Sequence, residues 1–245
     1  MKEKIVIIPT YNEIENIEDI LTVIMNLEGD FHVLVVDDNS PNGTATKIKE
    51  LQEKYPNRII LEERSEKSGL GTAYIHGFKK ALEAGYSYIF EMDADFSHNP
   101  NDLIRLYEAC ANQGFDMAIG SRYVTGVNVV NWPMSRVLMS YFASFYVRLI
   151  TGMPIRDATA GFKCYTKKVL ETINLDNINF VGYAFQIEMK FLSWKYGFQI
   201  KEVPIIFTDR TRGVSKMSTR IFREALLGVI QMKIMSLFNT YQRSV

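Results

Sequence analysis

Blocks of apolar residues, separated by polar turns, divide the first half of the chain into five predicted strands that alternate with helices. The apolar runs have the length of buried strands and lie at 4–8, 32–36, 58–61, 88–93 and 116–120. The segments between them show helical periodicity, and Asn12 is the predicted cap of the first helix. This alternation predicts an α/β fold whose mostly parallel central sheet carries helices on both faces.

The second half of the chain has a less regular pattern. It predicts helices at 132–150, 183–196 and 219–239, and strands at 157–165 and 199–207. Pro204 places the last strand at an edge of the sheet, because proline has no amide proton to donate to a neighbouring strand. No repeat, low-complexity tract or linker interrupts the chain. We therefore predict one domain, 1–218, followed by a C-terminal amphipathic helix, 219–245, with no transmembrane segment.

Charge is balanced over the whole chain but not along it. The 245 residues, enough for a sizeable core, include 28 Lys and Arg and 28 Asp and Glu. This balance gives no support to nucleic-acid binding, and we predict no nucleic-acid partner. Residues 120–168, however, contain seven basic residues and one acid, and residues 201–245 contain eight basic residues and three acids. A basic second half is typical of proteins that bind phosphates or lipid head groups.

Two cysteines and the ends of the chain bear on its compartment. Cys110 and Cys164 are far apart and lack the spacing of metal ligands, so we predict free thiols in a reducing compartment. The first residues run directly into a strand and offer no signal peptide. No stretch reaches the ~20 uninterrupted apolar residues that a membrane span requires. These features together predict a cytoplasmic protein.

Two carboxylates stand at the end of the predicted strand 88–93. Asp93 and Asp95 are one residue apart, so both side chains can point to the same side. Their charges repel unless a cation compensates them, and Mg²⁺ or Mn²⁺ suits such hard oxygen ligands. An acidic turn is the alternative explanation for an isolated Asp-x-Asp sequence. Polar loops that follow two other strands, at 11–13 and 37–38, favour a ligand site, because ligands bind beyond the carboxyl ends of parallel strands.

Five motifs along the first half of the chain occur in a familiar order. They are Pro9-Thr10-Tyr11-Asn12-Glu13, Val36-Asp37-Asp38-Asn39-Ser40-Pro41, Gly69-Leu70-Gly71-Thr72, Asp93-Ala94-Asp95 and Gly120-Ser121-Arg122-Tyr123. In this order they resemble the inverting family 2 glycosyltransferases. Three later motifs narrow the resemblance to the dolichol-phosphate mannosyltransferases, also called polyprenol monophosphomannose synthases. These motifs are Asp157-x-Thr159-x-Gly161-Phe162-Lys163, Gly182-Tyr183-x-Phe185-Gln186-x-Glu188, and Arg210 with Gly213-x-Ser215-Lys216.

The resemblance implies a GT-A type fold and the transfer of mannose from GDP-mannose to a polyprenyl (dolichyl) phosphate with inversion. It assigns the guanosine to Pro9, Tyr11, Glu13, Val36 and Asp38. It places the diphosphate, the ribose and a Mg²⁺ or Mn²⁺ ion at Asp93, Ala94, Asp95 and Ser97. It gives the diphosphate clamp to Arg210 and Lys216, and the lipid phosphate to Arg122 and Arg136. Asp95, Arg122, Arg210 and Lys216 are then the predicted catalytic residues, and Ser97 replaces a longer metal ligand of some members.

The residue types agree with this chemistry. Departing GDP develops negative charge, which a metal ion, an arginine and a lysine stabilise. The acceptor is a phosphate monoester, whose second pKa is about 6, so it is largely ionised at pH 7 without help from a general base. Two arginines suit the positioning of such anions because a guanidinium binds phosphate through two parallel hydrogen bonds.

Several alternatives remain open at the level of sequence. Tyr11 and Phe185 are core aromatics in the alternative interpretation, and His98 is either a turn residue or a neighbour of the metal. Lys163 either orients its strand or contacts the substrate. Gln186 and Glu188 either satisfy buried backbone groups or, as the family pattern implies, lie near the acceptor. The alternative functions are a UDP-glucose-dependent glucosyltransferase acting on the same lipid, a non-catalytic sugar-nucleotide-binding protein, and a nucleotidyltransferase. The last is disfavoured because no glycine-rich, lysine-bearing loop follows the first strand.

A lipid acceptor requires the protein to reach a bilayer. The segments 132–150 and 219–239 combine apolar residues with basic flanks, as interfacial helices do, and we predict a peripheral protein on the cytoplasmic face of the membrane. Packing of these segments into the core or into a dimer interface is the alternative. A separate membrane-anchoring partner would then recruit the protein.

Overall fold

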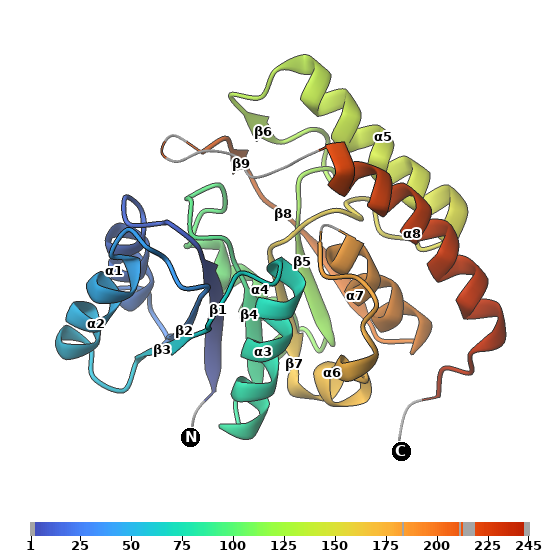
Figure 1. The fold of residues 1–245 in the computed structure, drawn as a ribbon. Coiled ribbons are helices and arrows are strands. Elements are labelled where there is room, and N and C mark those ends of the chain that lie inside the picture. The colour runs from blue at the N-terminus through green and yellow to red at the C-terminus, as the bar shows by residue number, and fades with distance from the viewer. Residues whose placement is uncertain (1–2, 183, 211, 213–218, 243–245) are drawn as a thin grey trace.

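A seven-stranded sheet forms the centre of the molecule (Figure 1). The computed structural model describes residues 3–182, 184–210, 212 and 219–242, and for residues 219–224 it describes the backbone alone. The strands are β1 (Lys4–Thr10), β2 (His32–Asp37), β3 (Ile59–Glu63), β4 (Tyr88–Glu91), β5 (Met117–Ser121), β7 (Lys163–Thr166) and β8 (Ile200–Pro204). Their order in the sheet is β3-β2-β1-β4-β7-β5-β8. Every pair is parallel except the two that β7 makes, with β4 and β5. The predicted mostly parallel sheet is confirmed, and Pro204 lies in the strand at its edge.

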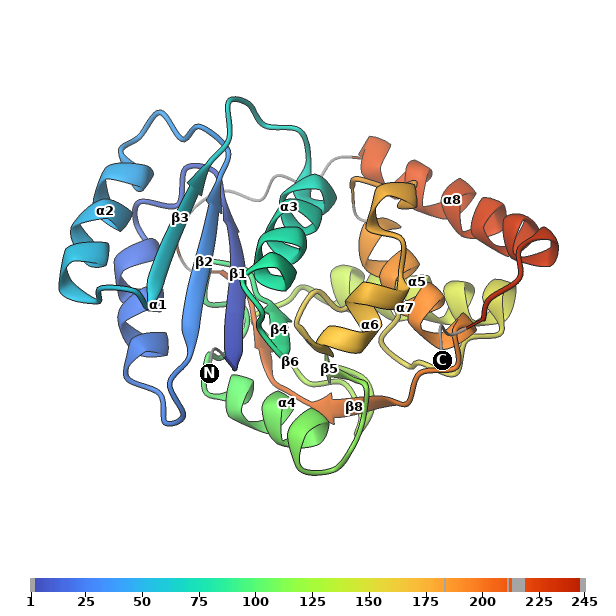
Figure 2. The same ribbon diagram turned by 90° about the horizontal axis from the view of Figure 1, so that it is seen from below.

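Helices cover both faces of this sheet (Figure 2). One face carries α1 (Ile17–Met25), α2 (Thr44–Lys54) and α4 (Asp102–Ala111), and the other carries α3 (Leu70–Glu83), α6 (Lys167–Thr172) and α7 (Ala184–Lys195). A short 3₁₀ turn, η1 (Leu175–Asn177), joins α6 to α7. Side chains of β1 alternate between the two cores, with Ile5 and Ile7 in one and Val6 and Ile8 in the other. Burial on both faces explains why this strand is a continuous apolar run.

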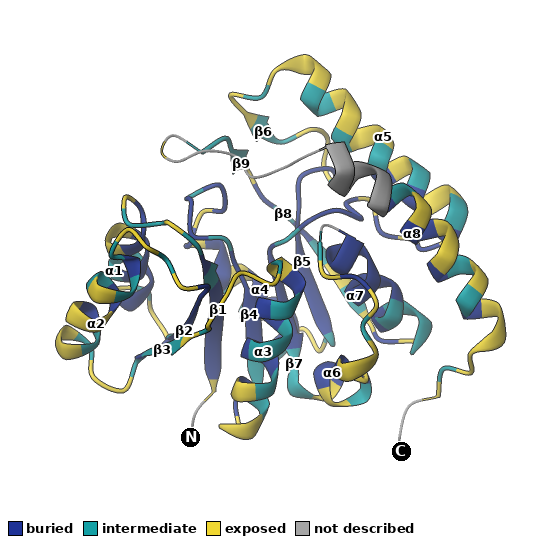
Figure 3. Ribbon diagram, in the orientation of Figure 1, coloured by how far each residue is buried: buried dark blue, intermediate teal, exposed yellow. Residues whose placement is uncertain are grey.

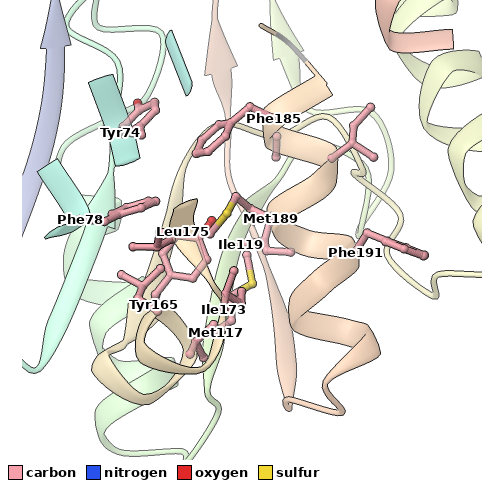
Figure 4. Packing of buried hydrophobic residues seen from close by; sticks show 14 of the residues in the cluster. Tyr74, Phe78, Met117, Ile119, Tyr165, Ile173, Leu175, Phe185, Met189 and Phe191 are labelled. Carbon is pink, nitrogen blue, oxygen red and sulfur yellow. The ribbon is translucent and has the colours of Figure 1, made fainter. Parts of the chain in front are cut away.

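Aromatic packing fixes α7 against α3 and the sheet (Figure 4). The rings of Tyr74 and Phe185 stack with their centroids 6.0 Å apart, and Phe78 meets Tyr165 edge-on at 5.5 Å. Phe185 is fully buried in this cluster, so the alternative interpretation of it as a core residue is confirmed. Aromatic contacts of this kind stabilise a core beyond the area that they bury, and here they hold the start of α7 in place.

Two predicted boundaries were wrong, and long-range hydrogen bonds explain both. The first helix begins at Ile17 and its cap position is Asn16, whereas Asn12 has a φ of 60° within the preceding loop. That loop is tied to the next one, since the backbone N–H of Asn12 donates to Ser40 Oγ at 2.9 Å. The strand predicted at 157–165 shrinks to β7, because the residues before it form a loop whose Asp157 carboxylate binds Arg122.

Two long helices lie side by side outside the sheet layers (Figure 1). They are α5 (Met134–Thr151) and α8 (Thr219–Phe238), close to the predicted bounds. The helix α8 contributes Ala225, Val229 and Met232 to the core, while the division of the chain at residue 218 stays a prediction. Neither helix, nor any other in the described ranges, is long and apolar enough to cross a membrane. A two-stranded sheet of β6 (Val129–Val130) and β9 (Phe207–Thr208) lies near the start of α5 (Figure 1).

Candidate active site

The predicted nucleotide residues lie at the carboxyl ends of β1 and β2. Pro9 and Val36 are register partners on these two strands. Tyr11 and Glu13 follow β1, and the ring of Tyr11 lies 4.4 Å from Lys67 Nζ. Neither Tyr11 nor Glu13 is fully buried. The sheet therefore brings these four predicted residues to one edge, beside the end of β2.

The two acids after β2 have different roles. Asp37 is fully buried and accepts hydrogen bonds from Thr10 Oγ1 at 2.7 Å and from the N–H and Oγ of Ser40. These bonds make Asp37 a support of the loop. Asp38 accepts from Arg64 Nε at 2.7 Å, and although burial raises the pKa of Asp38, the Arg64 hydrogen bond and charge oppose that rise. Sequence reasoning missed Arg64, although it directly follows the third strand and so occupies another strand end.

Asp93 and Asp95 follow β4 and face different partners. Asp95 is buried, accepts from the N–H of Ser97 at 3.0 Å and lies 2.9 Å from Arg210 Nη2. Burial alone would raise the pKa of Asp95, but the Ser97 hydrogen bonds and the charge of Arg210 outweigh burial and lower it. Asp93 approaches Tyr74 OH at 3.5 Å, and burial together with the charge of Asp95 raises the pKa of Asp93 to about 7. The sequence thus places the pair correctly, and the structure makes the two acids unequal.

This acid pair fits a divalent cation. Arg210 already provides a positive charge at Asp95, where the cation is expected. No cluster of three His, Cys, Asp or Glu side chains occurs in the described ranges, so the protein offers a partial oxygen set instead of a full cage. Mg²⁺ is commonly held in this way, by one or two carboxylates, waters and the phosphates of a substrate. Asp93, Asp95 and Ser97 are the residues that would hold it.

His98 lies beside the acid pair as a buried side chain. The ring is buried, stacks on Phe162 at a centroid distance of 4.9 Å, and places Nδ1 3.9 Å from Asp93 Oδ2. Burial lowers the pKa of His98 to about 4, which keeps the ring neutral at pH 7.

The two predicted acceptor arginines have acidic partners. Arg122 is buried, and its N–H, Nε and Nη2 donate to the carboxylate of Asp157 at 2.6–2.9 Å. Burial alone would raise the pKa of Asp157, but Arg122 outweighs it and the pKa is lowered. Arg136 lies on α5, donates to Asp209 Oδ1 at 2.8 Å and lies 4.1 Å from the Trp132 ring.

Aromatic rings connect these arginines to the acid pair. Phe207 lies 5.2 Å from Trp132, 5.3 Å from His98 and 5.5 Å from the Arg122 guanidinium. The small sheet holds the following segment above β4, because the N–H of Thr208 donates to the carbonyl of Ser97 at 3.2 Å. Asp209 and Arg210 therefore reach Arg136 and Asp95 respectively.

The structure thus brings together the described members of the predicted site: nucleotide residues, acid pair, Arg122, Arg136 and Arg210. Lys216 lies outside the described residues. Such a site combines carboxylates for a cation with guanidinium groups for anions. It is suited to holding two phosphate-bearing molecules close together.

Comparisons with known proteins agree with this geometry. The family model "Glycosyl transferase family 2" matches residues 5–173. A polyprenol monophosphomannose synthase of Mycolicibacterium smegmatis is 46% identical over 227 residues, which cover 93% of this chain and 85% of that protein. An undecaprenyl-phosphate mannosyltransferase of Micrococcus luteus is 45% identical over 91% of this chain and 90% of the relative. A dolichol-phosphate mannosyltransferase of Pyrococcus furiosus is 41% identical over 90% of this chain but only 61% of its own length.

Solved structures share the fold at low sequence identity. Glucosyl-3-phosphoglycerate synthase of Mycobacterium tuberculosis, solved with Mn²⁺, UDP and phosphoglyceric acid, gives a TM-score of 0.68 at 14% identity. The match covers 98% of this chain and 79% of that one. TarS of S. aureus gives a TM-score of 0.65 at 17% identity, covering 97% of this chain and 66% of that one.

These structural matches confirm the predicted GT-A type fold. The family model covers more than half of the chain, and relatives above 40% identity cover about nine-tenths of it. The chain therefore belongs to glycosyl transferase family 2 and is a glycosyltransferase.

Proposed function

We propose that this glycosyltransferase transfers mannose from GDP-mannose to a polyprenyl (dolichyl) phosphate, with inversion and with Mg²⁺ or Mn²⁺. The observation that carries the proposal is the convergence of the Asp93–Asp95 pair with Arg122, Arg136 and Arg210 at one edge of the sheet. Three relatives named for mannose transfer to a polyprenyl or dolichol carrier support the substrate class. The products would be polyprenyl-phosphate mannose and GDP.

The donor nucleotide would bind across the ends of β1, β2 and β4. The carboxylate of Asp38 would accept hydrogen bonds from the N–H groups of guanine. Arg64, which lies beside Asp38, would donate a hydrogen bond to the guanine carbonyl. Tyr11 and Lys67 flank this region. The diphosphate would then extend toward Asp95 and Arg210, next to the acid pair.

The residues at the diphosphate would stabilise the leaving group. A bound cation, held by Asp93, Asp95 and Ser97, supplies positive charge to the diphosphate. Arg210 would turn from Asp95 to the diphosphate and, with Lys216, neutralise the charge that develops on departing GDP.

The acceptor needs positioning and no general base. Its phosphate monoester has a second pKa of about 6, so the attacking oxygen is already anionic at pH 7. Arg136 is partly exposed, and Arg122, which is buried and paired with Asp157, would add a second positive charge. Together they would hold the lipid phosphate on the face of the sugar opposite to the departing GDP, which gives inversion.

An apolar face on α5 and α8 would bring the site to the membrane. Figure 3 shows exposed positions along both helices. The large apolar residues among the exposed positions are Met134, Leu138, Met139, Tyr141, Phe142, Phe145 and Leu149 on α5 and Leu227, Ile230, Ile234, Leu237 and Phe238 on α8. Interfacial helices bury such faces at the boundary between head groups and acyl chains, and flanking Lys and Arg side chains add attraction to anionic lipid. We assign the protein to the cytoplasmic face as a peripheral protein, where GDP-mannose would be available. A separate anchoring partner is the alternative route to the bilayer.

A donor panel tests the proposal. The purified protein is incubated with a polyprenyl phosphate in detergent, with Mn²⁺ or Mg²⁺, and with GDP-mannose, UDP-glucose, UDP-galactose or GDP-glucose in turn. Mannolipid formed from GDP-mannose, and lost on chelation of the metal, is the expected result. Glucolipid from UDP-glucose would move the enzyme to the alternative donor class, and binding without turnover of any donor would favour a sugar-nucleotide-binding protein.

A further inference from the structure

A buried polar network lies beneath the acid pair. Glu91 and Lys163 are both 0% exposed, and Lys163 Nζ lies 3.0 Å from Glu91 Oε2. Tyr165 OH donates to Glu91 Oε1 at 2.8 Å, and Lys163 also donates to Gln186 Oε1. A buried ion pair is often no more stabilising than apolar residues of the same volume. Stability alone therefore does not explain why the Glu91–Lys163 pair lies next to the acid pair of the site.

The network determines how Gln186 is oriented. A lysine ammonium has three donors and no acceptor, so the amide oxygen of Gln186 must face Lys163 and its NH₂ group must point away. The backbone of Gln186 is also fixed, because Lys190 Nζ donates to its carbonyl at 2.9 Å and to the carbonyl of Ala160 at 2.6 Å. Gln186 is 2% exposed, yet its Nε2 has no hydrogen-bond partner within the described part of the chain.

The NH₂ group of Gln186 lies close to Gly161, where the missing side chain leaves room for about one methyl group. A Cβ atom built on Gly161 would lie 3.7 Å from Gln186 Nε2, 3.9 Å from Asp93 Oδ2 and 3.9 Å from His98 Cε1. Three side chains from separate segments thus converge on one point, where glycine leaves room. His98 is buried and its Nδ1 also lacks a hydrogen bond to any described residue.

The order of the strands shows which part of a sugar nucleotide would reach this point. The nucleotide residues stand at β2 and β1, the acid pair follows the next strand, β4, and Gly161 precedes β7, the strand beyond β4. A nucleotide sugar laid along this edge has its base at β2 and its diphosphate at β4. The transferred sugar then comes next, in the direction of Gly161 and Gln186.

We propose that Gln186 is a substrate-positioning residue that binds one hydroxyl group of the transferred sugar together with Asp93. The hydroxyl oxygen would accept a hydrogen bond from Gln186 Nε2, and the hydroxyl O–H would donate a hydrogen bond to the Asp93 carboxylate. A hydroxyl group has both capacities, whereas an ionised phosphate oxygen has no O–H to donate to the Asp93 carboxylate. The Glu91–Lys163 pair is the support that holds the amide in this orientation. The inference rests on the proposed function in one respect, that the donor is a sugar nucleotide.

The test compares Gln186→Met with Gln52→Met. The first change removes the donor at similar volume, and the second makes the same change on α2, where Gln52 Nε2 donates to the carbonyl of Ile59 at 3.2 Å. Calorimetry in the presence of Mn²⁺ measures the binding of GDP-mannose and of GDP, which lacks the transferred sugar. We expect Gln186→Met to weaken GDP-mannose about tenfold, the loss of roughly one hydrogen bond, and to change GDP less than twofold. Gln52→Met should leave both affinities unchanged.

Monodeoxy analogues of the donor identify the hydroxyl group. For one analogue, the turnover ratio of wild-type protein to Gln186→Met should approach one, because the partner of the amide is then already missing. An equal loss of GDP and GDP-mannose binding in Gln186→Met would move the contact to the ribose and overturn the proposal. The proposal would also be overturned if Gln186→Met and Gln52→Met bound every donor with the same affinity. If the donor panel selects a different sugar nucleotide, the same comparison is made with that donor and its own nucleoside diphosphate, so the two proposals fail separately.

Discussion

At the residue scale, the arginines of the site are held by acids of the chain. The pairs are Arg64–Asp38, Arg122–Asp157, Arg136–Asp209 and Arg210–Asp95. A charge in a partly buried site is costly without a partner, and each of these guanidinium groups is paired with a carboxylate of the chain. For Arg210, binding of the diphosphate would exchange one partner for another, and the charge of the released Asp95 must then be compensated as well.

This exchange predicts that Arg210 competes with the metal ion for Asp95. Arg210→Gln should make the nucleotide-free protein bind Mn²⁺ about tenfold more tightly. The reason is that unit charges 4 Å apart interact by about 4 kcal/mol at an effective dielectric constant of 20, and partial exposure of Arg210 reduces this value. Electron paramagnetic resonance of free Mn²⁺ measures the affinity. Transfer should fall about 100-fold in the same variant, because a stabilising group for departing GDP is lost.

Two variants frame that measurement. Arg136→Gln is the matched control, since Arg136 pairs with Asp209 and should leave the Mn²⁺ affinity unchanged. Asp95→Asn should abolish Mn²⁺ binding and transfer together. Equal Mn²⁺ affinity in wild-type protein and Arg210→Gln would show that Arg210 does not compete for the site.

A second prediction separates acceptor from donor. Arg136→Gln should raise the KM for polyprenyl phosphate about tenfold in detergent, since a hydrogen bond to a charged group is worth about 1.5–3 kcal/mol. The Kd of GDP-mannose should change less than twofold by calorimetry. Arg148→Gln, an exposed arginine on the same helix, is the control and should change neither. A loss of GDP-mannose binding in Arg136→Gln as large as in Arg210→Gln would refute the division.

At the scale of elements, α5 and α8 combine a buried side with an apolar exposed side. Val147 and Met232 face the core, whereas Phe142, Phe145 and Leu237 are exposed. Tyr146 OH donates to the carbonyl of Leu226 at 3.0 Å and joins the two helices. Because both sides of each helix carry apolar residues, the sequence pattern alone could not separate core packing from interfacial binding.

The exposed side predicts binding to anionic vesicles. Phe142→Ser with Phe145→Ser should reduce flotation with phosphatidylglycerol-containing liposomes at least tenfold, because burial of each aromatic side chain is worth about 1.5–3 kcal/mol. Binding of the wild-type protein should weaken as salt rises. Transfer to detergent-dispersed lipid should stay near the wild-type rate, which serves as the control for folding. Wild-type protein that ignores anionic vesicles at low salt, while it still glycosylates dispersed lipid, would favour recruitment by a separate membrane partner.

At the scale of the whole molecule, the Arg122–Asp157 pair ties the loop after β5 to the loop before β7. Arg122→Ala should lower the free energy of unfolding by about 3–5 kcal/mol, since it leaves Asp157 buried without a partner. Arg122→Met with Asp157→Leu should recover most of that loss without recovering transfer. Urea denaturation measures both. Recovered transfer in the double variant would remove Arg122 from acceptor binding.

The same pair predicts an acid dependence of stability. The pKa of Asp157 is lowered in the folded protein from its usual value of 3.8, so the unfolded chain takes up the proton first as the pH falls. The contribution of the pair is therefore complete above about pH 4 and is lost as the pH decreases through the folded pKa. Asp157→Asn should flatten the fall in the free energy of unfolding in this range. An unchanged slope would show that other carboxylates control acid unfolding.

The sequence by itself determined the order of strands and helices along the chain, and it determined which residues follow the strand ends. Apolar periodicity is a local property, so β1, β2, β4 and β5 lie close to their predicted ranges. The carboxyl ends of parallel strands meet at one edge, which is why Asp38, Asp93 and Asp95 were placed together correctly. The predicted role of Asn12 as a helix cap was wrong, because a hydrogen bond to Ser40 in the next loop, 28 residues away, decides its conformation.

The tertiary structure alone decided which residues pair. β7 enters the sheet antiparallel between β4 and β5, and no local pattern carries this information. The partner of Arg136 lies 73 residues away, and Lys163 meets Gln186 across 23 residues from a different element. Pairing at such separations depends on how elements pack, whereas propensity and periodicity act within one element. For this reason the sequence indicated the chemistry of the site, and only the fold brought Gln186 and Asp93 together beside Gly161.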